Sequence, residues 1–254
     1  MLWRRNIGRY TLGKLIVVGI GPGDYENMTV RADRALQNSD VIIGYTVYVD
    51  LVRERYPDKE FFETPMTRET ERCQIAIDEA RKGKTVAMVC SGDSGIYGMA
   101  ALIYELRGES NDPEVEVIPG LTAACSGGAL LGAPLTHDFA VISLSNRLTP
   151  WEKIAKRLEC AAMADLGIVL YNPRSKGRPD NLRLACDILL KYLPADRPCG
   201  VAHYIGREGE ESFFLTLAEL RSADIDMFST VFIGNAQTKM IAGRMVTPRG
   251  YKDV

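Results

Sequence analysis

Three glycine-rich segments in the first half of the chain have the residue types that let a ligand approach the backbone. They are GIGPGD at 19–24, SGDSGIYG at 91–98 and PGLTAACSGG at 119–128. Each directly follows a short apolar segment, and glycine removes the side chain that would keep a ligand away from the main chain. The carboxylate of Asp93 could accept ribose hydroxyl groups or cap a following helix. Taken singly, each segment is equally compatible with a tight turn.

The segment at 19–24 departs from a dinucleotide-binding loop. In a G-x-G-x-x-G motif the third glycine would stand where this chain has Asp24, and Pro22 removes a backbone N–H from any phosphate cradle. The acid nearest the second predicted strand, Asp40, precedes that strand, whereas a ribose-binding acid ends it. A nicotinamide-dependent oxidoreductase is therefore the poorer hypothesis.

The second half of the chain carries a local positive segment, YNPRSKGR at 171–178, in a protein whose formal net charge is −2. Arg174 could bind a carboxylate through two parallel hydrogen bonds. Lys176 and Arg178, taken individually, are equally typical of a solvated loop. Arg207 follows another predicted strand. The absence of a general basic excess argues against a nucleic-acid partner.

The sequence has two histidines, His137 and His203, and six scattered cysteines without a C-x-x-C pair. A histidine-rich metal site cannot be built from these, so we expect no protein-held metal and reduced thiols in a cytoplasmic protein. His137 could exchange a proton near neutral pH. Its neighbour Asp138 would point to the opposite face of a strand, so no relay is implied, and a structural histidine is the simpler interpretation.

Short β-branched segments alternate with amphipathic ones, which predicts an α/β protein. The predicted strands are 15–20, 41–44, 85–90, 115–118, 139–144, 167–172, 199–204 and 229–235, with a hairpin element at 211–215. The predicted helices are 29–38, 69–82, 96–107, 121–131, 151–164 and 181–192. We expect two α/β domains, 14–119 and 120–254. No segment approaches the ~18 consecutive apolar residues of a membrane span, so no membrane partner is expected.

The order of these motifs resembles that of the tetrapyrrole (corrin/porphyrin) methylases. GxGPGD, GD-xx-Y, PG-xTA and the later YN-P-R and GR segments occur in that order from about Lys14 to Asn235. HDFAVISLSNRLTPW and YNPRSKGRPDNL resemble the branch that methylates C17 of precorrin-3B or cobalt-factor III, with ring contraction, in cobalamin biosynthesis. The resemblance implies the class III methyltransferase fold: two α/β domains with S-adenosylmethionine in the cleft between them, S-adenosylhomocysteine as product, an anionic tetrapyrrole substrate and a homodimer.

The resemblance also implies roles for individual residues. The cofactor-binding positions would be Pro22, Ser91, Gly92, Asp93, Ile96, Thr122, Ala123, Asn172 and Gly206. Arg174, Lys176 and Arg207 would bind the substrate, and Asp24 or His137 would act as acid or base. Asn172 stands where relatives often have methionine, and Ser94 replaces the usual proline after Gly-Asp.

Three alternatives remain open at this stage. The chain could methylate another tetrapyrrole position, C11 or C20. It could be an RNA or protein methyltransferase of the same fold, although the sequence has no broad basic or aromatic face for RNA. It could also be a non-catalytic module that binds the methyl donor, in which case the positive segment at 171–178 would have no evident purpose.

Overall fold

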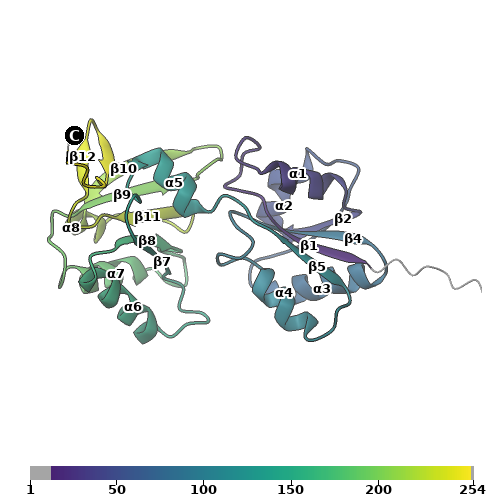
Figure 1. Ribbon diagram of the computed structural model, residues 1–254. Helices are drawn as coiled ribbons and strands as arrows, with labels where there is room; N and C mark the ends of the chain where they lie inside the picture. Colours follow the sequence, from purple (N-terminus) through teal and green to yellow (C-terminus); the bar gives the residue numbers. More distant parts are fainter. Residues whose placement is uncertain (1–12, 253–254) are drawn as a thin grey trace, which may run out of the picture. The chain divides into compact units, whose positions relative to one another are not determined.

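The computed structural model describes residues 13–252. Its contacts divide the chain into two compact units, the first ending at Thr122 and the second beginning at Ala123. The sequence places a domain boundary at 119, near this division. Each unit has its own sheet and its own buried cores, and each is described by itself below (Figure 1).

The first unit is built on a five-stranded parallel sheet. Its strands are β1 (Lys14–Gly19), β2 (Val41–Tyr45), β3 (Glu60–Thr64), β4 (Thr85–Cys90) and β5 (Glu114–Ile118). Their order across the sheet is β3-β2-β4-β1-β5, and every pairing is parallel. Gly19 is in register with Cys90, and Val18 is in register with Ile118. The carboxyl ends of β4, β1 and β5 are therefore level and adjacent.

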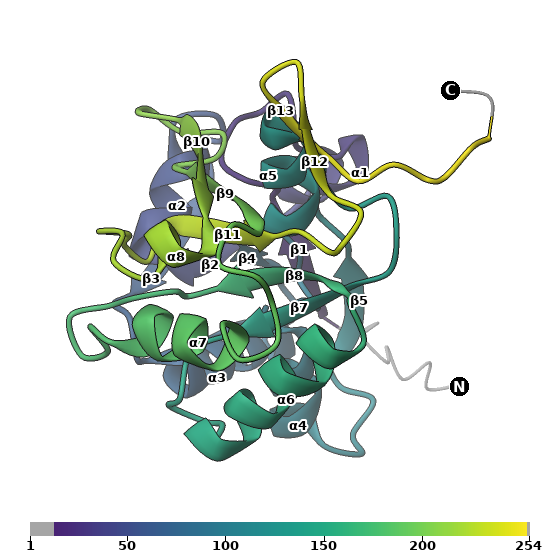
Figure 2. The ribbon, with the colours of Figure 1, turned by 90° about the vertical axis from the view of Figure 1, so that its left-hand side faces the viewer.

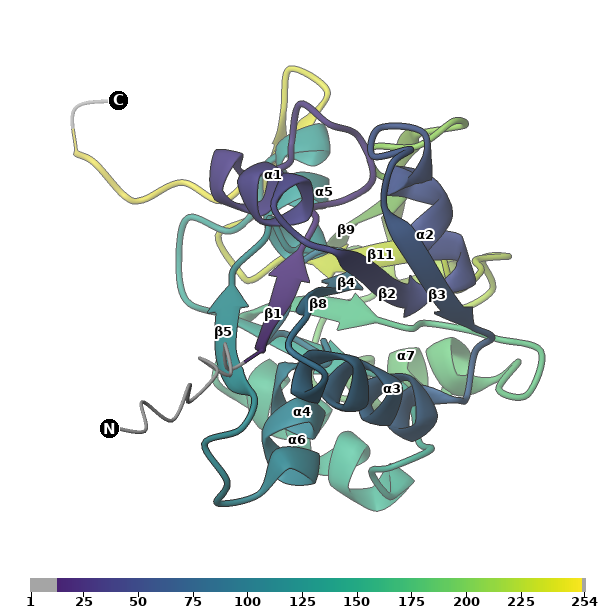
Figure 3. The same cartoon turned by 90° about the vertical axis from the view of Figure 1, so that its right-hand side faces the viewer.

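Helices cover both faces of this sheet. They are α1 (Val30–Gln37), α2 (Thr46–Arg53), α3 (Glu69–Arg81) and α4 (Ala100–Arg107). Because successive strand side chains point to opposite faces, Leu15 and Val17 pack with α3 and α4, while Ile16 and Val18 pack with α1 and α2. Figure 3 shows the two helix pairs on either side of the sheet. Burial on both faces explains why β1, β2 and β4 are continuous apolar runs in the sequence.

The first unit differs from the sequence prediction at two places. The α2 segment and β3 were not predicted, because TVYVDLVR is rich in β-branched residues that do not suggest a helix. In the structure Val49 and Val52 are buried in the α1/α2 core, so tertiary packing overrides local preference. The helix predicted from Ile96 begins only at Ala100. Tyr97 has a φ of +56°, which interrupts a right-handed helix.

The second unit has a five-stranded mixed sheet and a smaller three-stranded one. The larger sheet contains β7 (Phe139–Ser143), β8 (Gly167–Tyr171), β9 (Pro198–His203), β10 (Glu211–Thr216) and β11 (Ser229–Ile233), in the order β10-β9-β11-β8-β7. Only β7 and β8 pair in parallel. The smaller sheet joins β12 (Lys239–Ile241), β13 (Arg244–Val246) and β6 (Gly132–Ala133). The hairpin element predicted at 211–215 is confirmed as β10, which runs antiparallel to β9.

Four helices pack on the larger sheet of the second unit: α5 (Ala123–Leu131), α6 (Trp151–Met163), α7 (Asn181–Leu189) and α8 (Leu217–Leu220) (Figure 2). Residues of α6, α7 and α8 share one core with Ile168, Leu170 and Val201. Residues of α5 share another with Val169 and Phe232. Ile168 and Leu170 lie in the first core and Val169 lies in the second. Successive side chains of β8 therefore point to opposite faces of the sheet, and both faces are buried.

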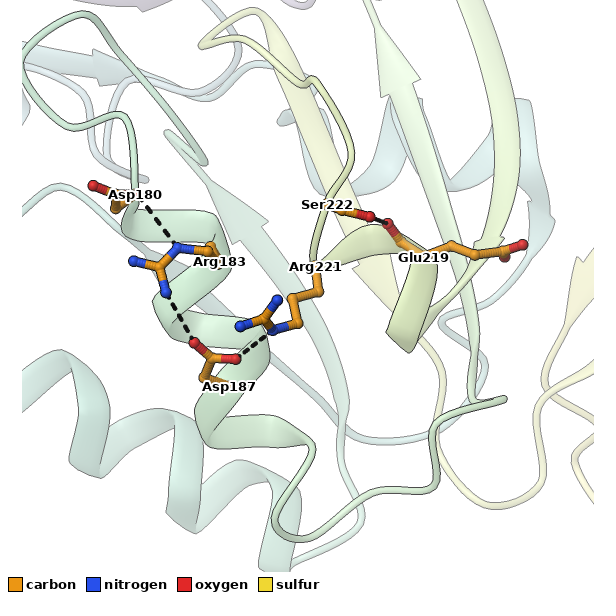
Figure 4. A network of polar contacts seen from close by, with 6 residues as sticks. All are labelled: Asp180, Arg183, Asp187, Glu219, Arg221 and Ser222. Atoms are coloured by element: carbon orange, nitrogen blue, oxygen red, sulfur yellow. Dashed lines mark hydrogen bonds and ion pairs between the residues drawn. The ribbon is translucent and has the colours of Figure 1, made fainter.

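An ion network links α7 to α8. Asp187 accepts hydrogen bonds from Arg183, one turn earlier on α7, at 3.2 Å and from Arg221, just after α8, at 2.5 Å (Figure 4). Arg183 also contacts Asp180 at 3.3 Å. The hydrogen bond from Arg221 keeps the pKa of Asp187 below its ordinary value. The short α8 is thereby attached to the longer helix.

Among residues 13–252, no helix combines the length and the apolar character that crossing a bilayer requires. The alternation of strands and helices confirms the α/β class that the sequence pattern predicts.

Candidate functional site

In the first unit, the three glycine-rich loops meet at the carboxyl edge of β4, β1 and β5. Gly21 and Gly92 exchange two backbone hydrogen bonds, of 3.1 Å from Gly21 N and 2.7 Å from Gly92 N. Ile20 N also donates to Cys90 O at 2.9 Å. The loops after β1 and β4 are therefore fixed to each other directly beyond the strand ends, where open α/β sheets bind ligands.

Asp93 connects the loop after β4 to the loop after β5. Its Oδ1 accepts hydrogen bonds from Gly95 N at 2.8 Å and Ile96 N at 2.9 Å, and its Oδ2 accepts one from Gly120 N at 2.9 Å. A carboxylate offers about four acceptor positions, so these bonds leave about one available on Oδ2. Because α4 begins only at Ala100, the carboxylate organises the loop and does not cap a helix.

Two glycines allow the backbones of these loops to touch. A Cβ atom on Gly120 would lie 2.1 Å from Gly92 O and 2.6 Å from Gly19 C, both backbone atoms. A Cβ atom on Gly19 would lie 2.5 Å from Gly120 N. No side chain fits at either position without displacing a strand end. The glycine spacing noted in the sequence is thus required by the contact between the loops.

Buried side chains support the floor of this edge. Ser94 is fully buried and its Oγ donates to Ile118 O at 2.8 Å. Cys90 Sγ accepts a hydrogen bond from Met99 N at 3.5 Å. Burial raises the pKa of the Cys90 thiol to about 11, so the thiol is protonated near neutral pH and does not serve as a nucleophile. Pro22 and Thr122 are also buried here, whereas Ile96 is exposed.

Asp24, predicted as an acid or base, lies in the loop after β1. Its two carboxylate oxygens accept hydrogen bonds from the backbone and side-chain nitrogens of Asn27, at 2.7 and 2.8 Å. This pairing shapes the turn that leads to Thr29, whose hydroxyl accepts a bond from Ala32 N at the start of α1. Asp24 is therefore on the correct edge of the sheet, with its carboxylate engaged in a local turn.

A buried carboxylate, Asp33 on α1, binds Tyr25 in the loop after β1. It accepts hydrogen bonds from Tyr56 at 2.6 Å, from Gln37 at 2.8 Å and from Tyr25, the residue after Asp24, at 3.3 Å. Arg55 lies 3.6 Å from the same carboxylate and stacks on the Tyr25 ring. Burial alone would raise the pKa of Asp33, but these hydrogen bonds and the Arg55 charge outweigh it and lower the pKa. The ionised form of Asp33 is therefore the one that holds Tyr25.

In the second unit, the loops after the parallel strands β7 and β8 are joined by hydrogen bonds. Asn172 Nδ2 donates to Ser143 Oγ at 3.0 Å, and Leu144 N donates to Tyr171 O at 2.9 Å. Asn181, at the start of α7, donates to Leu144 O at 2.6 Å. Asn172 has a φ of +53°, a conformation that asparagine tolerates better than most residues. The two strand-end loops form one connected surface.

The predicted positive residues of the loop after β8 differ in their surroundings. Arg174 forms an ion pair with Asp224. Lys176 is exposed and has no ionic partner among residues 13–252. Arg178 is half-buried and donates to the hydroxyls of Ser175 and Ser145. The loop thus presents charges that internal carboxylates only partly neutralise.

Gly206 lies beyond β9 in a tight turn. Its backbone N donates to Glu210 Oε2 at 2.7 Å, and Arg207 N donates to Tyr204 O at 2.9 Å. Tyr204 stacks on Phe228 with ring centroids 5.2 Å apart. His203 Nδ1 lies 2.8 Å from Ser229 Oγ, which makes it a hydrogen-bonded part of the sheet.

The structure does not bring His137 to the loops that hold Asn172 and Arg174. His137 precedes the amino end of β7, and its Nε2 lies 3.0 Å from Pro248 O. The parallel strands β7 and β8 carry Ser143 and Asn172 at their other end, about 13 Å away along the strand. An acid or base role for His137 stays a prediction.

Several positioning residues were not assigned from the sequence. Tyr171 OH accepts a hydrogen bond from Ala124 N at 2.7 Å, linking the end of β8 to the start of α5. Ser143 and Ser145 join the two loops of the second unit. The sequence signal that could have found them is the polar SLSN segment at 143–146, which spans the end of β7, together with Tyr171 at the end of β8. Among residues 13–252, no three His, Cys, Asp or Glu side chains gather to hold a metal.

Comparison with known proteins assigns this architecture. The family model for Tetrapyrrole (Corrin/Porphyrin) Methylases matches residues 14–221. The probable cobalt-factor III C(17)-methyltransferase of Salmonella typhimurium is 48% identical over 93% of this chain and 99% of its own. The cobalt-factor III methyltransferase of Priestia megaterium is 45% identical over 94% of this chain, but that match covers only 45% of the longer Priestia protein.

A solved structure agrees with these relatives. The crystal structure of the methyltransferase CobJ superposes with a TM-score of 0.86 and 33% sequence identity, covering 93% of this chain and 100% of CobJ. A match over 93% of this chain includes most of both units. The resemblance seen in the ordered motifs is confirmed: the chain belongs to the tetrapyrrole (corrin/porphyrin) methylase family.

Proposed function

We propose that this protein transfers a methyl group from S-adenosylmethionine to C17 of cobalt-factor III, with contraction of the macrocycle, in cobalamin biosynthesis. The observation that carries the proposal is the 48% identity over 99% of the Salmonella relative, which is named a probable cobalt-factor III C(17)-methyltransferase. Precorrin-3B, the metal-free counterpart, is the alternative substrate. Cobalt, where it is present, belongs to the substrate and requires no ligand set in the protein.

The loops of the first unit fit the methyl donor that this family uses. Gly92, Asp93 and Thr122 lie where the three strand-end loops meet, and the glycines of these loops carry no side chain that would keep a ligand from the backbone. Asp93 keeps about one acceptor position for a hydroxyl group. We assign Pro22, Ser91, Gly92, Asp93, Ile96, Thr122, Ala123, Asn172 and Gly206 to donor binding.

Bound there, S-adenosylmethionine supplies a methyl group already activated by its sulfonium, so the protein needs no nucleophile of its own. The task of these residues is orientation and exclusion of water, and orientation alone can lower a barrier by roughly 7–11 kcal/mol. The neutral state of the Cys90 thiol is consistent with a reaction that needs no nucleophile from the protein. Asp24 is the proposed acid/base residue for the proton movements of ring contraction; for His137 the same role is a prediction that its place before the amino end of β7 disfavours.

The second unit supplies positive charge for an acid-rimmed macrocycle. Arg174, Lys176 and Arg207 are proposed to bind substrate carboxylates, since guanidinium and ammonium groups pair with such anions. We propose in addition that the protein acts as a cytoplasmic homodimer without nucleic acid. Equilibrium sedimentation would test the dimer.

Anaerobic incubation with S-adenosylmethionine and either cobalt-factor III or precorrin-3B tests the function. The expected result is a mass gain of one methyl group, formation of S-adenosylhomocysteine and an absorbance change of the macrocycle. Analysis of the methyl position by NMR separates C17 from C11 and C20. Methylation of RNA or protein in place of either tetrapyrrole would contradict the proposal, and so would donor binding without any transfer.

A further inference from the structure

Two arginines from neighbouring loops of the second unit lie on one connected surface. Arg178 belongs to the loop after β8, and Arg147 belongs to the loop after β7, its parallel neighbour. Arg178 Nε donates to Ser175 Oγ at 3.0 Å, and its terminal nitrogen donates to Ser145 Oγ, two residues before Arg147. The serine contacts fix the Arg178 guanidinium next to the segment that carries Arg147.

Neither arginine has a carboxylate partner among residues 13–252. The two acceptors of Arg178 are neutral hydroxyls, whereas Arg174 in the same loop is paired with Asp224. Burial, and then the nearby charge of Arg147, lower the pKa of Arg178 below its ordinary value. An anion bound at this position would relieve both effects, because it replaces lost solvation and separates two like charges.

The N-termini of two helices follow the loops that carry these arginines. Helices α6 and α7 begin immediately after the two loops, at Trp151 and Asn181, and neither has a side-chain hydrogen bond at its N-cap. Their first backbone N–H groups carry the positive end of the helix dipole. The nearest acids along the chain are Glu152, on α6, and Asp180, which is engaged by Arg183.

We propose that Arg147 and Arg178 together bind one carboxylate of the substrate's peripheral acid side chains. The inference deepens the proposed function and rests on it, because it takes the bound anion to be part of the tetrapyrrole. Guanidinium groups bind carboxylates in a planar, two-bond geometry, and Ser145 and Ser175 hold one of them in place. Neither arginine is among Arg174, Lys176 and Arg207, the substrate-binding residues that the family resemblance implies.

The pair is better suited to this task than Arg174. An incoming carboxylate at Arg174 has to compete with Asp224, which is already bound. At Arg178 it displaces no acid, because the guanidinium donates to the neutral hydroxyls of Ser175 and Ser145. Arg147 and Arg178 therefore set the position of the macrocycle, with Arg174 secondary.

The test compares Arg147→Gln, Arg178→Gln and Arg178→Lys with Arg157→Gln, an exposed control on α6 that loses the same charge. Binding of cobalt-factor III is followed by absorbance titration, and binding of S-adenosylmethionine by calorimetry. We expect a roughly 10- to 100-fold weaker tetrapyrrole affinity for each Gln variant, since a hydrogen bond to a charged group is lost. Arg178→Lys should recover part of the loss, and Arg157→Gln should behave as wild type. Donor affinity should be unchanged throughout.

A second titration uses cobalt-factor III with its acid side chains esterified. The Gln substitutions should then cost little, because the carboxylate that the arginines bind is absent. An equal loss with acid and ester would show that the substitutions merely distort the loops and would overturn the proposal, as would unchanged affinity for the acid. Wild-type protein that binds cobalt-factor III but produces no methylated product would refute the proposed function alone.

Discussion

Asp93 Oδ2 accepts a hydrogen bond from Gly120 N at 2.9 Å, and this bond spans two loops that follow different strands of the first sheet. The other oxygen of the same carboxylate closes the turn at Gly95 and Ile96. One side chain thus sets the shape of its own loop and the position of the next. Glycine residues have no side chain that restricts the backbone, so these loops are conformationally free on their own. The hydrogen bonds of Asp93 are what give the two loops a defined conformation.

Replacing Asp93 with asparagine should loosen both loops. An amide offers one acceptor oxygen, so either Gly120 N or the pair at Gly95 and Ile96 loses its partner, at about 1–3 kcal/mol. We expect at least tenfold weaker binding of S-adenosylmethionine by calorimetry. Asp58→Asn, an exposed substitution with the same charge change, is the control. Equal donor affinity for the two variants would contradict the role given to Asp93.

Gly120→Ala should separate the loops after β4 and β5. The new methyl group would lie 2.1 Å from Gly92 O and 2.6 Å from Gly19 C. Both are backbone atoms, which cannot move aside by rotation about a side-chain bond. We expect a loss of about 1–3 kcal/mol in the free energy of unfolding, measured with urea, together with weaker donor binding. Gly177→Ala, where a Cβ meets nothing within 4 Å, should leave both quantities unchanged. A fully stable Gly120→Ala variant with normal donor affinity would show that the close approach is not required.

Asp33→Asn should destabilise the protein in a pH-dependent way. The folded-state pKa of Asp33 lies below its ordinary value of 3.8, so its stabilising effect is complete above that value and is lost as the pH falls through the folded pKa. The variant should therefore be less stable than wild type at neutral pH, by about 1–3 kcal/mol, and approach wild type on acidification. Urea unfolding across this range measures the difference. A difference that does not change with pH would mean that the Asp33 charge is not what holds Tyr25 and Tyr56.

The sequence predicted the features that follow from the spacing of apolar residues and from the order of the motifs along the chain. In the first sheet, β1, β2 and β4 were recognised because both faces are buried and their apolar runs are continuous, and β5 was recognised from the short VEVI segment, whereas β3 was not predicted. The ligand edge followed from the motifs at the carboxyl ends of the strands. The sequence could not predict α2, whose β-branched residues become helical only because Val49 and Val52 pack on the sheet. Nor could it predict the Asp33 cluster, because Tyr25 and Tyr56 meet that carboxylate only after the chain folds.

The ion pair between Arg174 and Asp224 allows the role of Arg174 in substrate binding to be tested by changing either partner. Arg174→Glu should raise the substrate KM by repelling an acidic substrate, while donor affinity is kept. Asp224→Asn should release Arg174 and lower the substrate KM or leave it as in wild type. Steady-state kinetics at saturating donor would separate the two variants. If Arg174→Glu leaves the substrate KM unaltered, Arg174 does not contact the substrate.

His137→Ala tests an acid/base role against the position that the structure gives this residue. The His137 ring lies beside Pro248 O, before the amino end of β7, whereas Ser143 and Asn172 mark the opposite end of the paired strands. A general acid or base must reach the proton it transfers, directly or through one water molecule. We therefore expect His137→Ala to retain wild-type rates of methylation and ring contraction, with at most a small loss of stability from the missing hydrogen bond. Stopped-flow absorbance follows contraction separately from methyl transfer. A selective loss of contraction in His137→Ala, with methyl transfer intact, would instead establish the histidine as the proton-transfer group and would require the substrate to reach the amino end of β7.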